Sequence, residues 1–204
     1  MSAIAIRDQE ADEEAVYPKR NLSIPDKGHM IYPYLLKGLN ISHPHHVWAG
    51  DITFIRMRKG FIYLTAIMDW FSRYILSWKI SITIDAGFCI EALSSALTMG
   101  TPDIFNSDQG PQFTSSEFTS CLLDKKIGIS MDGRGRVFDN IFIERLWREV
   151  YLKDYANVWE AEDNLNTYFH FYNTERPHSA LGYMTPYEVY YGKRKTLSHI
   201  MAMR

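Results

Sequence analysis

Three short runs of apolar residues, separated by turns, begin the patterned part of the chain. The first, Val47 to Ile55, is rich in β-branched and aromatic residues and leads into a turn at Arg58-Lys59-Gly60. The second run covers 61–68, and after a turn at 71–73 the third covers 74–80. Because these connections are short, the three strands are predicted to form an antiparallel meander. Their nearly continuous apolar character predicts a sheet that is covered on both faces.

A helical period follows the third strand. Apolar residues recur at helical spacing between Asp85 and Met99, and Gly100-Thr101-Pro102 ends the pattern. Residues 103–107 then have the composition of a fourth strand. Because this strand is reached through a helix, we expect it to run parallel to a neighbouring strand.

The remainder of the chain adds helices and one more strand. A helix begins at residue 115 or 116, a short strand covers 127–130, and a further helix carries Glu144. Two more helices are predicted, one over 159–172 and a short one that begins at Thr185. The expected fold class is therefore α/β. Its mixed five-stranded sheet, in which three antiparallel strands precede an αβαβ unit, is flanked by helices.

These patterns divide the chain into four parts. Residues 1–30 are acidic and show no apolar period, so we expect a disordered tail. Residues 31–46 form a linker, in which 31–36 is a candidate docking segment. The sheet and its helices occupy 47–156, and 157–204 form a helical extension with a basic tail.

Net charge becomes informative only when its distribution along the chain is considered. The 204 residues carry a formal charge of −2, which is not what a nucleic-acid-binding protein usually has. Residues 1–15 hold five acids against Arg7, however, and the rest of the chain has 21 basic and 19 acidic residues. A mildly basic body permits DNA binding without requiring it.

The cysteines and the apolar stretches restrict the cellular compartments in which the protein could work. Cys89 and Cys121 lie far apart in the sequence, which excludes a cysteine-type zinc finger and favours reduced thiols. No apolar stretch approaches the ~20 residues that span a bilayer. The acidic N-terminus also lacks the pattern of an export signal. We therefore expect a cytoplasmic protein with no membrane contact.

Three acids stand where a structural role is hard to assign. Asp51 interrupts a strand whose other residues belong in a core, and a buried carboxylate needs a partner. Asp108 ends the fourth strand just before Gly110-Pro111, which prevents further strand pairing. Glu144 follows three apolar residues, so its helix should pack closely on the sheet. Taken singly, these acids could be an edge charge, a turn residue and an exposed helix residue.

One shared site explains the three acids better than three separate structural roles. Clustered carboxylates repel one another unless cations neutralise them, and oxygen ligands suit hard divalent cations. Two Mg²⁺ ions ~3.5–4 Å apart would neutralise the cluster and support displacement at a phosphodiester, and we expect Mn²⁺ to substitute. Asp69 and Asp139 are competing acids, but their positions favour a turn cap and a helix start.

Basic residues near these acids are candidates for DNA contacts. Arg134 and Arg136 lie in a glycine-containing loop before the Glu144 helix and could hold backbone phosphates, although a solvated loop is an equal alternative. Arg148 lies one turn past Glu144, so it could face the same cleft. The C-terminal cluster Lys193-Arg194-Lys195 completes the set.

The segment His43-Pro44-His45-His46 suggests a metal site at first sight. We favour a polar linker before a strand, because neither a cysteine nor a second histidine pair lies at zinc spacing.

Five stretches of the sequence together resemble the transposases of the insertion sequence 3 family, which share a catalytic core with retroviral integrases. The matching stretches are Trp48 to Phe54, Asp69 to Arg73, Asn106 to Phe113, Asp139 to Glu144 and Tyr172 to Ser179. The similarity extends from about Ile31 to Gly192. It implies an RNase H-like fold, in which residues 31–46 are the remnant of an upstream region.

The resemblance also implies a chemistry. Asp51, Asp108 and Glu144 correspond to a DDE triad, and the 35 residues between the last two agree with the family's spacing. The implied activity is Mg²⁺-dependent DNA strand cleavage and strand transfer without a covalent protein–DNA intermediate. The implied partners are DNA at the element ends and target, further copies of the chain on that DNA, and a separate helix-turn-helix protein from an upstream reading frame.

The sequence departs from the family pattern in two places. Before Trp48 there is a lead-in of only about fifteen family-like residues, where relatives carry a helix-turn-helix region. After Arg148 about five residues are missing, which at ~100° per helical residue rotates the next segment by a net ~140°. The C-terminal helix pair must then repack, or the Glu144 helix must break. We hypothesise that this impairs activity.

Two other functions are compatible with the same acids. A truncated and catalytically impaired transposase remnant would bind DNA or a full-length transposase without turnover. A stand-alone nuclease of the same fold would have four acids rather than a triad. A retroviral-type integrase is disfavoured, because the sequence has no zinc module of two histidines and two cysteines.

Overall fold

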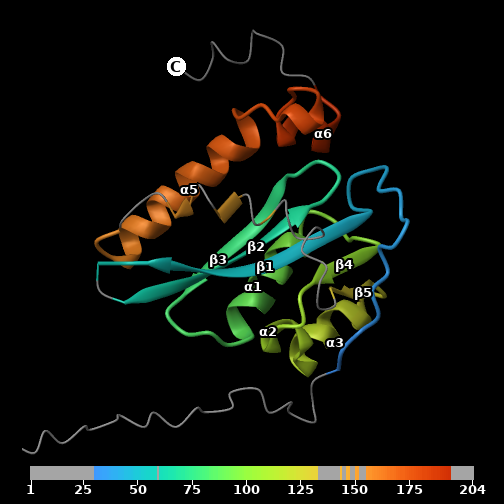
Figure 1. Ribbon diagram of the computed structural model, residues 1–204, viewed down its shortest axis with the longest axis horizontal. Helices are drawn as coiled ribbons and strands as arrows, with labels where there is room; N and C mark the ends of the chain where they lie inside the picture. Colours follow the sequence, from blue (N-terminus) through green and yellow to red (C-terminus); the bar gives the residue numbers. More distant parts are fainter. Residues whose placement is uncertain are drawn as a thin grey trace, which may run out of the picture.

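The computed structural model describes residues 30–58, 60–132, 143, 146–147, 150–151 and 155–193. A five-stranded sheet in the order β3-β2-β1-β4-β5 lies at its centre (Figure 1). The first three strands pair antiparallel, whereas β4 pairs parallel with β1 and β5 pairs parallel with β4. The strands are β1 (Val47–Arg56), β2 (Phe61–Asp69), β3 (Ile75–Ser81), β4 (Ile104–Ser107) and β5 (Gly128–Met131). The predicted meander and the predicted parallel fourth strand are both confirmed.

The described helices are α1 (Gly87–Leu97), α2 (Pro111–Thr114), α3 (Ser116–Asp124), α5 (Val158–Thr174), the 3₁₀ helix η1 (Ser179–Leu181) and α6 (Pro186–Tyr191). Three of them, α3, α5 and α6, begin at a residue whose side chain accepts one of the first free backbone N–H groups. Ser115 caps α3 and Asn157 caps α5, while Thr185 and Glu188 form a capping box on α6. The short helices α2 and η1 were not predicted.

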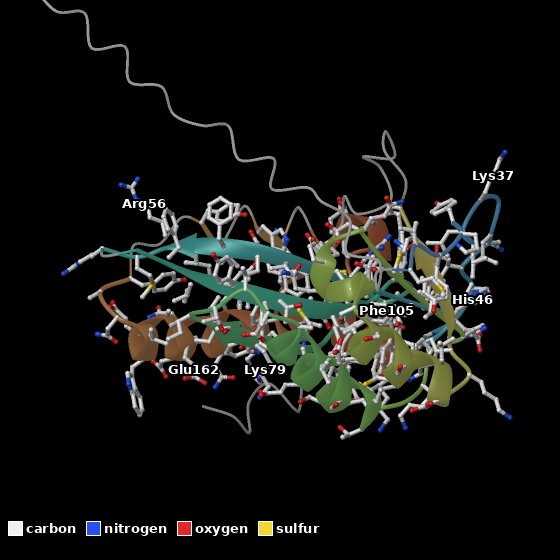
Figure 2. The ribbon with its side chains drawn as sticks, turned by 90° about the horizontal axis from the view of Figure 1, so that it is seen from below. Lys37, His46, Arg56, Lys79, Phe105 and Glu162 are labelled. Atoms are coloured by element: carbon white, nitrogen blue, oxygen red, sulfur yellow. The ribbon has the colours of Figure 1, made fainter. Side chains whose placement is uncertain are left out.

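Both faces of the sheet are covered, as the apolar runs predicted. One core joins the sheet to α5 and includes the buried residues Ile143, Leu146 and Trp147. A second core joins it to α1 and α3 around Phe105, which is fully buried (Figures 1 and 2). Cys89 belongs to this second core, and burial raises the pKa of its thiol to about 12, so it cannot serve as a thiolate nucleophile near neutral pH.

The predicted docking segment contacts the outer strand β5. The backbone N–H of Leu35 donates to Ser130 Oγ at 3.0 Å, and that of Tyr32 points at Met131 Sδ at 3.4 Å. Leu36 is buried in a small third cluster with Val47 and other residues at the start of β1. The lead-in to the first strand is therefore packed against the sheet from residue 32 onward.

Asp69 holds the turn between β2 and β3. Its side chain is fully buried, and Oδ1 accepts hydrogen bonds from both the backbone N–H and the hydroxyl of Ser72. Oδ2 accepts the backbone N–H of His45 at 2.6 Å, which ties the lead-in loop to this turn. Burial, together with the charge of Asp69, raises the pKa of the nearby Tyr190 hydroxyl. The predicted cap is confirmed, and this acid has a structural role.

We expect Asp69→Asn to lower the free energy of unfolding by about 2 kcal/mol or more, because an amide NH₂ would then face donors that now find acceptors. Urea unfolding would measure the loss. The matched control is Glu91→Gln, which removes only an exposed 3.9 Å contact with Lys79 and should cost under ~0.5 kcal/mol. Equal effects of the two substitutions would contradict the structural role of Asp69.

Candidate active site

The register of the parallel pair β1 and β4 brings two of the predicted acids together. Val47 pairs with Ile104 and Ala49 pairs with Asn106. The same register, continued by two residues, sets Asp51 opposite Asp108. Neighbouring strands lie ~4.8 Å apart, so the two carboxylates project from adjacent positions at one edge of the sheet.

Close packing beneath the acids fixes this register. A Cβ atom on Gly50 would lie only 2.6 Å from Cζ of Phe105, so glycine is needed for β1 to approach that ring. Phe105 in turn packs against Phe113 and Phe118 in a cluster of aromatic rings. The glycine next to Asp51 therefore sets how closely the two acid-bearing strands meet.

A local turn positions Asp108. Its Oδ1 accepts the backbone N–H of Gly110 at 3.0 Å, and Pro111 then begins α2. The Asp108 side chain is exposed, whereas Asp51 is half-buried. Within the residues that the structure describes, Oδ2 of Asp108 accepts no hydrogen bond. One carboxylate oxygen thus faces solvent beside a second carboxylate, the arrangement that favours a bound cation.

Trp147 is a further site residue that the sequence did not reveal. Its indole Nε1 donates a 2.8 Å hydrogen bond to Oδ2 of Asp51, and its ring is buried. Four residues later, the hydroxyl of Tyr151 contacts that of Thr53. The segment that contains Trp147 therefore lies along β1, over the face that carries Asp51. The only signal in the sequence was that a buried indole N–H needs an acceptor.

The remaining predicted site residues divide by whether the structure describes them. Lys193 is described, exposed and bonded through its backbone N–H to the Glu188 carbonyl just past α6. The others lie outside the described residues: Glu144, Asp139, Arg134, Arg136, Arg148, Arg194 and Lys195. The buried side chains of Ile143 and Leu146 show that the chain flanking Glu144 packs on the sheet.

Near the position where a loss of about five residues was predicted, the described residues change from helix to turn. Val150 is helical, Tyr151 lies in a turn, and Tyr155 forms a parallel bridge with Met57 at the end of β1. The Tyr155 carbonyl also accepts the backbone N–H of Arg58. The chain therefore returns to the sheet before α5 begins.

Comparison with known families agrees with this geometry. Residues 41–136 match a family described as integrase core domain, and residues 125–186 match a second family of the same description. Together the two matches cover residues 41–186, so most of the chain is similar to integrase core domains. Its mixed sheet flanked by helices is the RNase H-like fold of such cores. Among the described helices, none is long and apolar enough to cross a membrane.

Curated relatives of the chain are transposases of insertion sequences. The transposase for insertion sequence element IS904 from Lactococcus lactis is 32% identical over 152 residues, which cover 70% of this chain and 60% of the relative. The transposase for IS629 from Shigella sonnei is 29% identical over 152 residues, covering 71% of this chain and 51% of the relative. The chain thus spans little more than half the length of the curated relatives it matches.

Solved structures with this fold include retroviral integrase cores. The HTLV-2 integrase catalytic core domain, determined in complex with magnesium, is 24% identical with a TM-score of 0.60, and the match covers 72% of this chain and 97% of that one. The catalytic core domain of BIV integrase is 19% identical with a TM-score of 0.57, over 78% of this chain and 99% of that one. At these identities the match establishes the fold alone.

The hydrogen bond between Trp147 and Asp51 predicts an energetic coupling. A double-mutant cycle that combines Trp147→Phe with Asp51→Ala should give a coupling free energy of about 1–2 kcal/mol, because phenylalanine lacks the N–H donor and the cycle cancels the cost of its smaller ring. Urea unfolding of the four proteins would measure it. A cycle between Trp147→Phe and Asp124→Ala, an exposed acid on α3, serves as the control and should give a value near zero. Additive effects of the Trp147 and Asp51 substitutions would contradict the contact.

Proposed function

We propose that this protein is the catalytic core of a transposase that cleaves DNA strands and joins them to target DNA by a DDE mechanism. The observation that carries the proposal is the parallel register of β1 and β4, which pairs Ala49 with Asn106 and, when continued by two residues, aligns Asp51 with Asp108. The insertion-sequence transposases among its relatives support DNA as the substrate.

Glu144 is our proposed third acid. Trp147, three residues later in the sequence, donates to Asp51, and positions three apart on a helix lie on the same face. The described neighbours of Glu144 on both sides are buried against the sheet. These contacts support a carboxylate at position 144 that reaches the same edge of the sheet as the two aspartates.

The donor set fits hard divalent cations. Asp51, Asp108 and Glu144 would hold two Mg²⁺ ions, with Mn²⁺ able to substitute, and the HTLV-2 core with bound magnesium supports this choice. Bound there, the metals would supply Lewis acidity and a lowered pKa for the attacking hydroxyl. The protein's own contribution is to hold the three carboxylates in place, with Trp147 orienting Asp51 through Oδ2.

The same site would serve two successive displacements at phosphorus. In the first, a water oxygen forms a new P–O bond as the bond to the 3′ oxygen breaks, which leaves a free 3′-hydroxyl. In the second, that hydroxyl attacks a target phosphodiester, and a new P–O bond forms as the bond from the target phosphorus to its own 3′ oxygen breaks. In each step the attacking oxygen loses a proton and the leaving oxygen takes one up, and neither step requires a covalent link to the protein.

Binding partners and cellular setting follow from this activity. We propose that the chain acts as a homo-oligomer on DNA in the bacterial cytoplasm and that it works with a helix-turn-helix protein from an upstream reading frame. A solved structure with a similar fold comes from the intasome of a simian T-cell lymphotropic virus, and this supports assembly of the chain into an oligomeric complex. Arg134, Arg136, Arg148 and the cluster 193–195 are proposed to contact the DNA backbone.

Asp108→Asn should reduce Mg²⁺-dependent nicking of a plasmid carrying the element ends by at least ~100-fold, as expected for losing a group that stabilises the transition state. Retention of DNA in a gel-shift assay should be nearly unchanged, because phosphate contacts come from the basic residues. The matched control is Asp124→Asn, an exposed acid on α3. Nicking by Asp108→Asn at the control's rate would overturn the assignment.

Metal dependence gives a second test of the same site. Exhaustive chelation should abolish nicking, and adding back Mg²⁺ or Mn²⁺ should restore it, whereas Ca²⁺ should support DNA binding without cleavage because its coordination is larger and more flexible. Gel assays of nicked and joined products would measure both steps. Full activity after chelation, checked by atomic absorption, would contradict a metal-dependent mechanism.

A further inference from the structure

The loops that lead into β1 and β4 meet at the end of the strand pair opposite the acids. The register that pairs Val47 with Ile104, continued back by one residue, sets His46 opposite Asp103. Two backbone hydrogen bonds lock the loops together, from Asp103 N to His45 O at 2.9 Å and from Ile104 N to His46 O at 3.2 Å. The relative position of the two loops is therefore fixed by the main chain.

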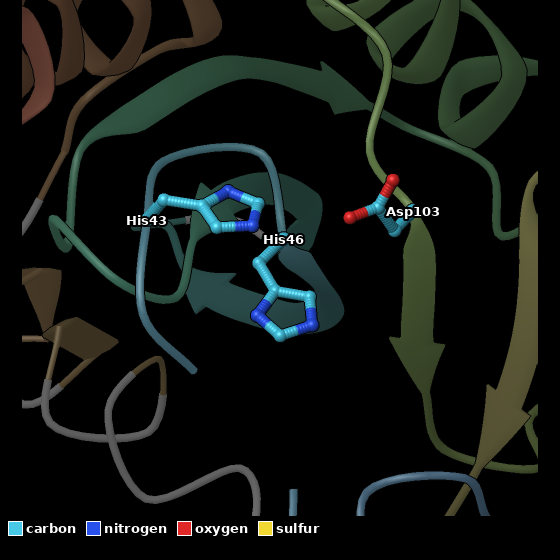
Figure 3. Close-up of side chains that lie close together, drawn as sticks. All are labelled: His43, His46 and Asp103. Atoms are coloured by element: carbon cyan, nitrogen blue, oxygen red, sulfur yellow. The ribbon is translucent and has the colours of Figure 1, made fainter. Parts of the chain in front are cut away.

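Three metal-binding side chains converge at this junction. One ligand atom from each of His43, His46 and Asp103 lies within 4.8 Å of the other two. The two imidazole rings stack with their centroids 4.7 Å apart, and the Asp103 carboxylate is directed toward them (Figure 3). Ligands on one tetrahedral zinc ion are ~3.3 Å apart, so small side-chain rotations would close the site.

Hydrogen bonding selects which nitrogen of each histidine can bind. His43 Nδ1 lies 2.9 Å from the Pro44 carbonyl, which can only accept, so Nδ1 carries the proton and Nε2 the lone pair. Such a bond to a backbone carbonyl is the usual partner of a metal-ligating histidine. His46 Nδ1 is buried, which leaves Nε2 as its nitrogen that can reach a ligand. The lone pair of His43 is thus on the nitrogen farther from the backbone, and in His46 the nitrogen at that position is the one left accessible.

The turn that carries the two histidines is held from several sides. His45 adopts a left-handed conformation with φ +65°, its backbone N–H binds the buried Asp69, and its ring nitrogen meets the Tyr190 hydroxyl at 3.0 Å. Gly100 provides the space for that ring, because a Cβ there would lie 2.4 Å from it. A non-glycine residue in this conformation is maintained only when its surroundings hold it. The flanking histidines are therefore presented on a fixed loop.

From these observations we propose that His43, His46 and Asp103 form a binding site for a divalent transition-metal ion, with Zn²⁺ the favoured ion. Two imidazoles and one carboxylate match the ligands of zinc sites, and imidazole nitrogens are poor ligands for Mg²⁺. The fourth position would be taken by water. Asp103 has no side-chain hydrogen bond or ion pair within the described residues, so its carboxylate is available.

A metal ion at the proposed site would link the lead-in segment, residues 31–46, to the sheet without involving Asp51 or Asp108. His46 and Asp103 each lie five residues before Asp51 and Asp108 on the same strands, a separation of ~16 Å. Figure 2 shows His46 at one end of β1 and Arg56 at the other. A metal that binds the folded chain but not the unfolded chain stabilises the fold by mass action. Metal binding at this site would therefore raise the midpoint of thermal unfolding without taking part in catalysis.

The test is a titration of the metal-free full-length protein with ZnCl₂ by calorimetry, in excess Mg²⁺ so that the acids are occupied. We expect one Zn²⁺ per chain and a higher thermal midpoint. The double variant H43Q/D103N should bind at least ~10-fold more weakly and lose that stabilisation. Both replaced side chains are exposed, so the variant should fold, which its thermal midpoint in chelator would confirm.

Two control proteins separate this site from its alternatives. D51N/D108N should still bind one Zn²⁺ per chain. H170Q, which changes an exposed histidine on α5, should bind Zn²⁺ as the parent protein does. Cobalt(II) should give a visible absorption band in the parent that H43Q/D103N lacks. The proposal is overturned if H43Q/D103N still binds one Zn²⁺ per chain with the affinity of the parent, if D51N/D108N no longer binds it, or if the parent protein binds none. Loss of nicking in D51N/D108N tests the proposed function separately.

Discussion

Parallel pairing between β1 and β4 is the constraint on which the arrangement of this protein depends. The two strands come from distant parts of the chain, and three paired positions fix their register. Continued beyond these pairs, that register aligns Asp51 with Asp108 and, at the other end, His46 with Asp103. Because side chains alternate between faces, a slip of one residue would send one member of each pair to the opposite face. The contacts that enforce the register, above all Gly50 against the buried ring of Phe105, therefore also align the polar groups.

Local patterns were enough to predict most of the fold. The meander followed from short turns between apolar runs, and the parallel fourth strand followed from the helix that precedes it. The sequence misled at Gly110-Pro111, where a break in pairing was predicted correctly but α2 was missed. Proline is compatible with the first position of a helix, so the same dipeptide that stops a strand can begin a helix. The 3₁₀ helix η1 is only three residues long, too short to show a period.

The site was predictable only as far as single strands allow. Asp51 and Asp108 could be found because each breaks or ends an apolar run, and the parallel register then sets them opposite one another. Trp147 could not be assigned to Asp51, because that contact depends on how the segment crosses the sheet. The histidines at 43 and 46 looked like a linker, since the carboxylate that joins them belongs to the loop before another strand. Spacing within one segment does not show which side chain from another segment completes a site.

The contrast between Asp69 and Asp108 explains why one acid is structural and the other is suited to hold a metal. Asp69 is fully buried, and three donors from Ser72 and His45 occupy its two oxygens, so its charge is already compensated within the fold. Asp108 is exposed, and the one donor it has among the described residues, Gly110 N–H, fixes the carboxylate without satisfying both oxygens. A neutral indole N–H on Asp51 orients that neighbour but cannot cancel its charge. Like charges that lie side by side repel one another, and a cation bound at the second oxygen of Asp108 would relieve that repulsion.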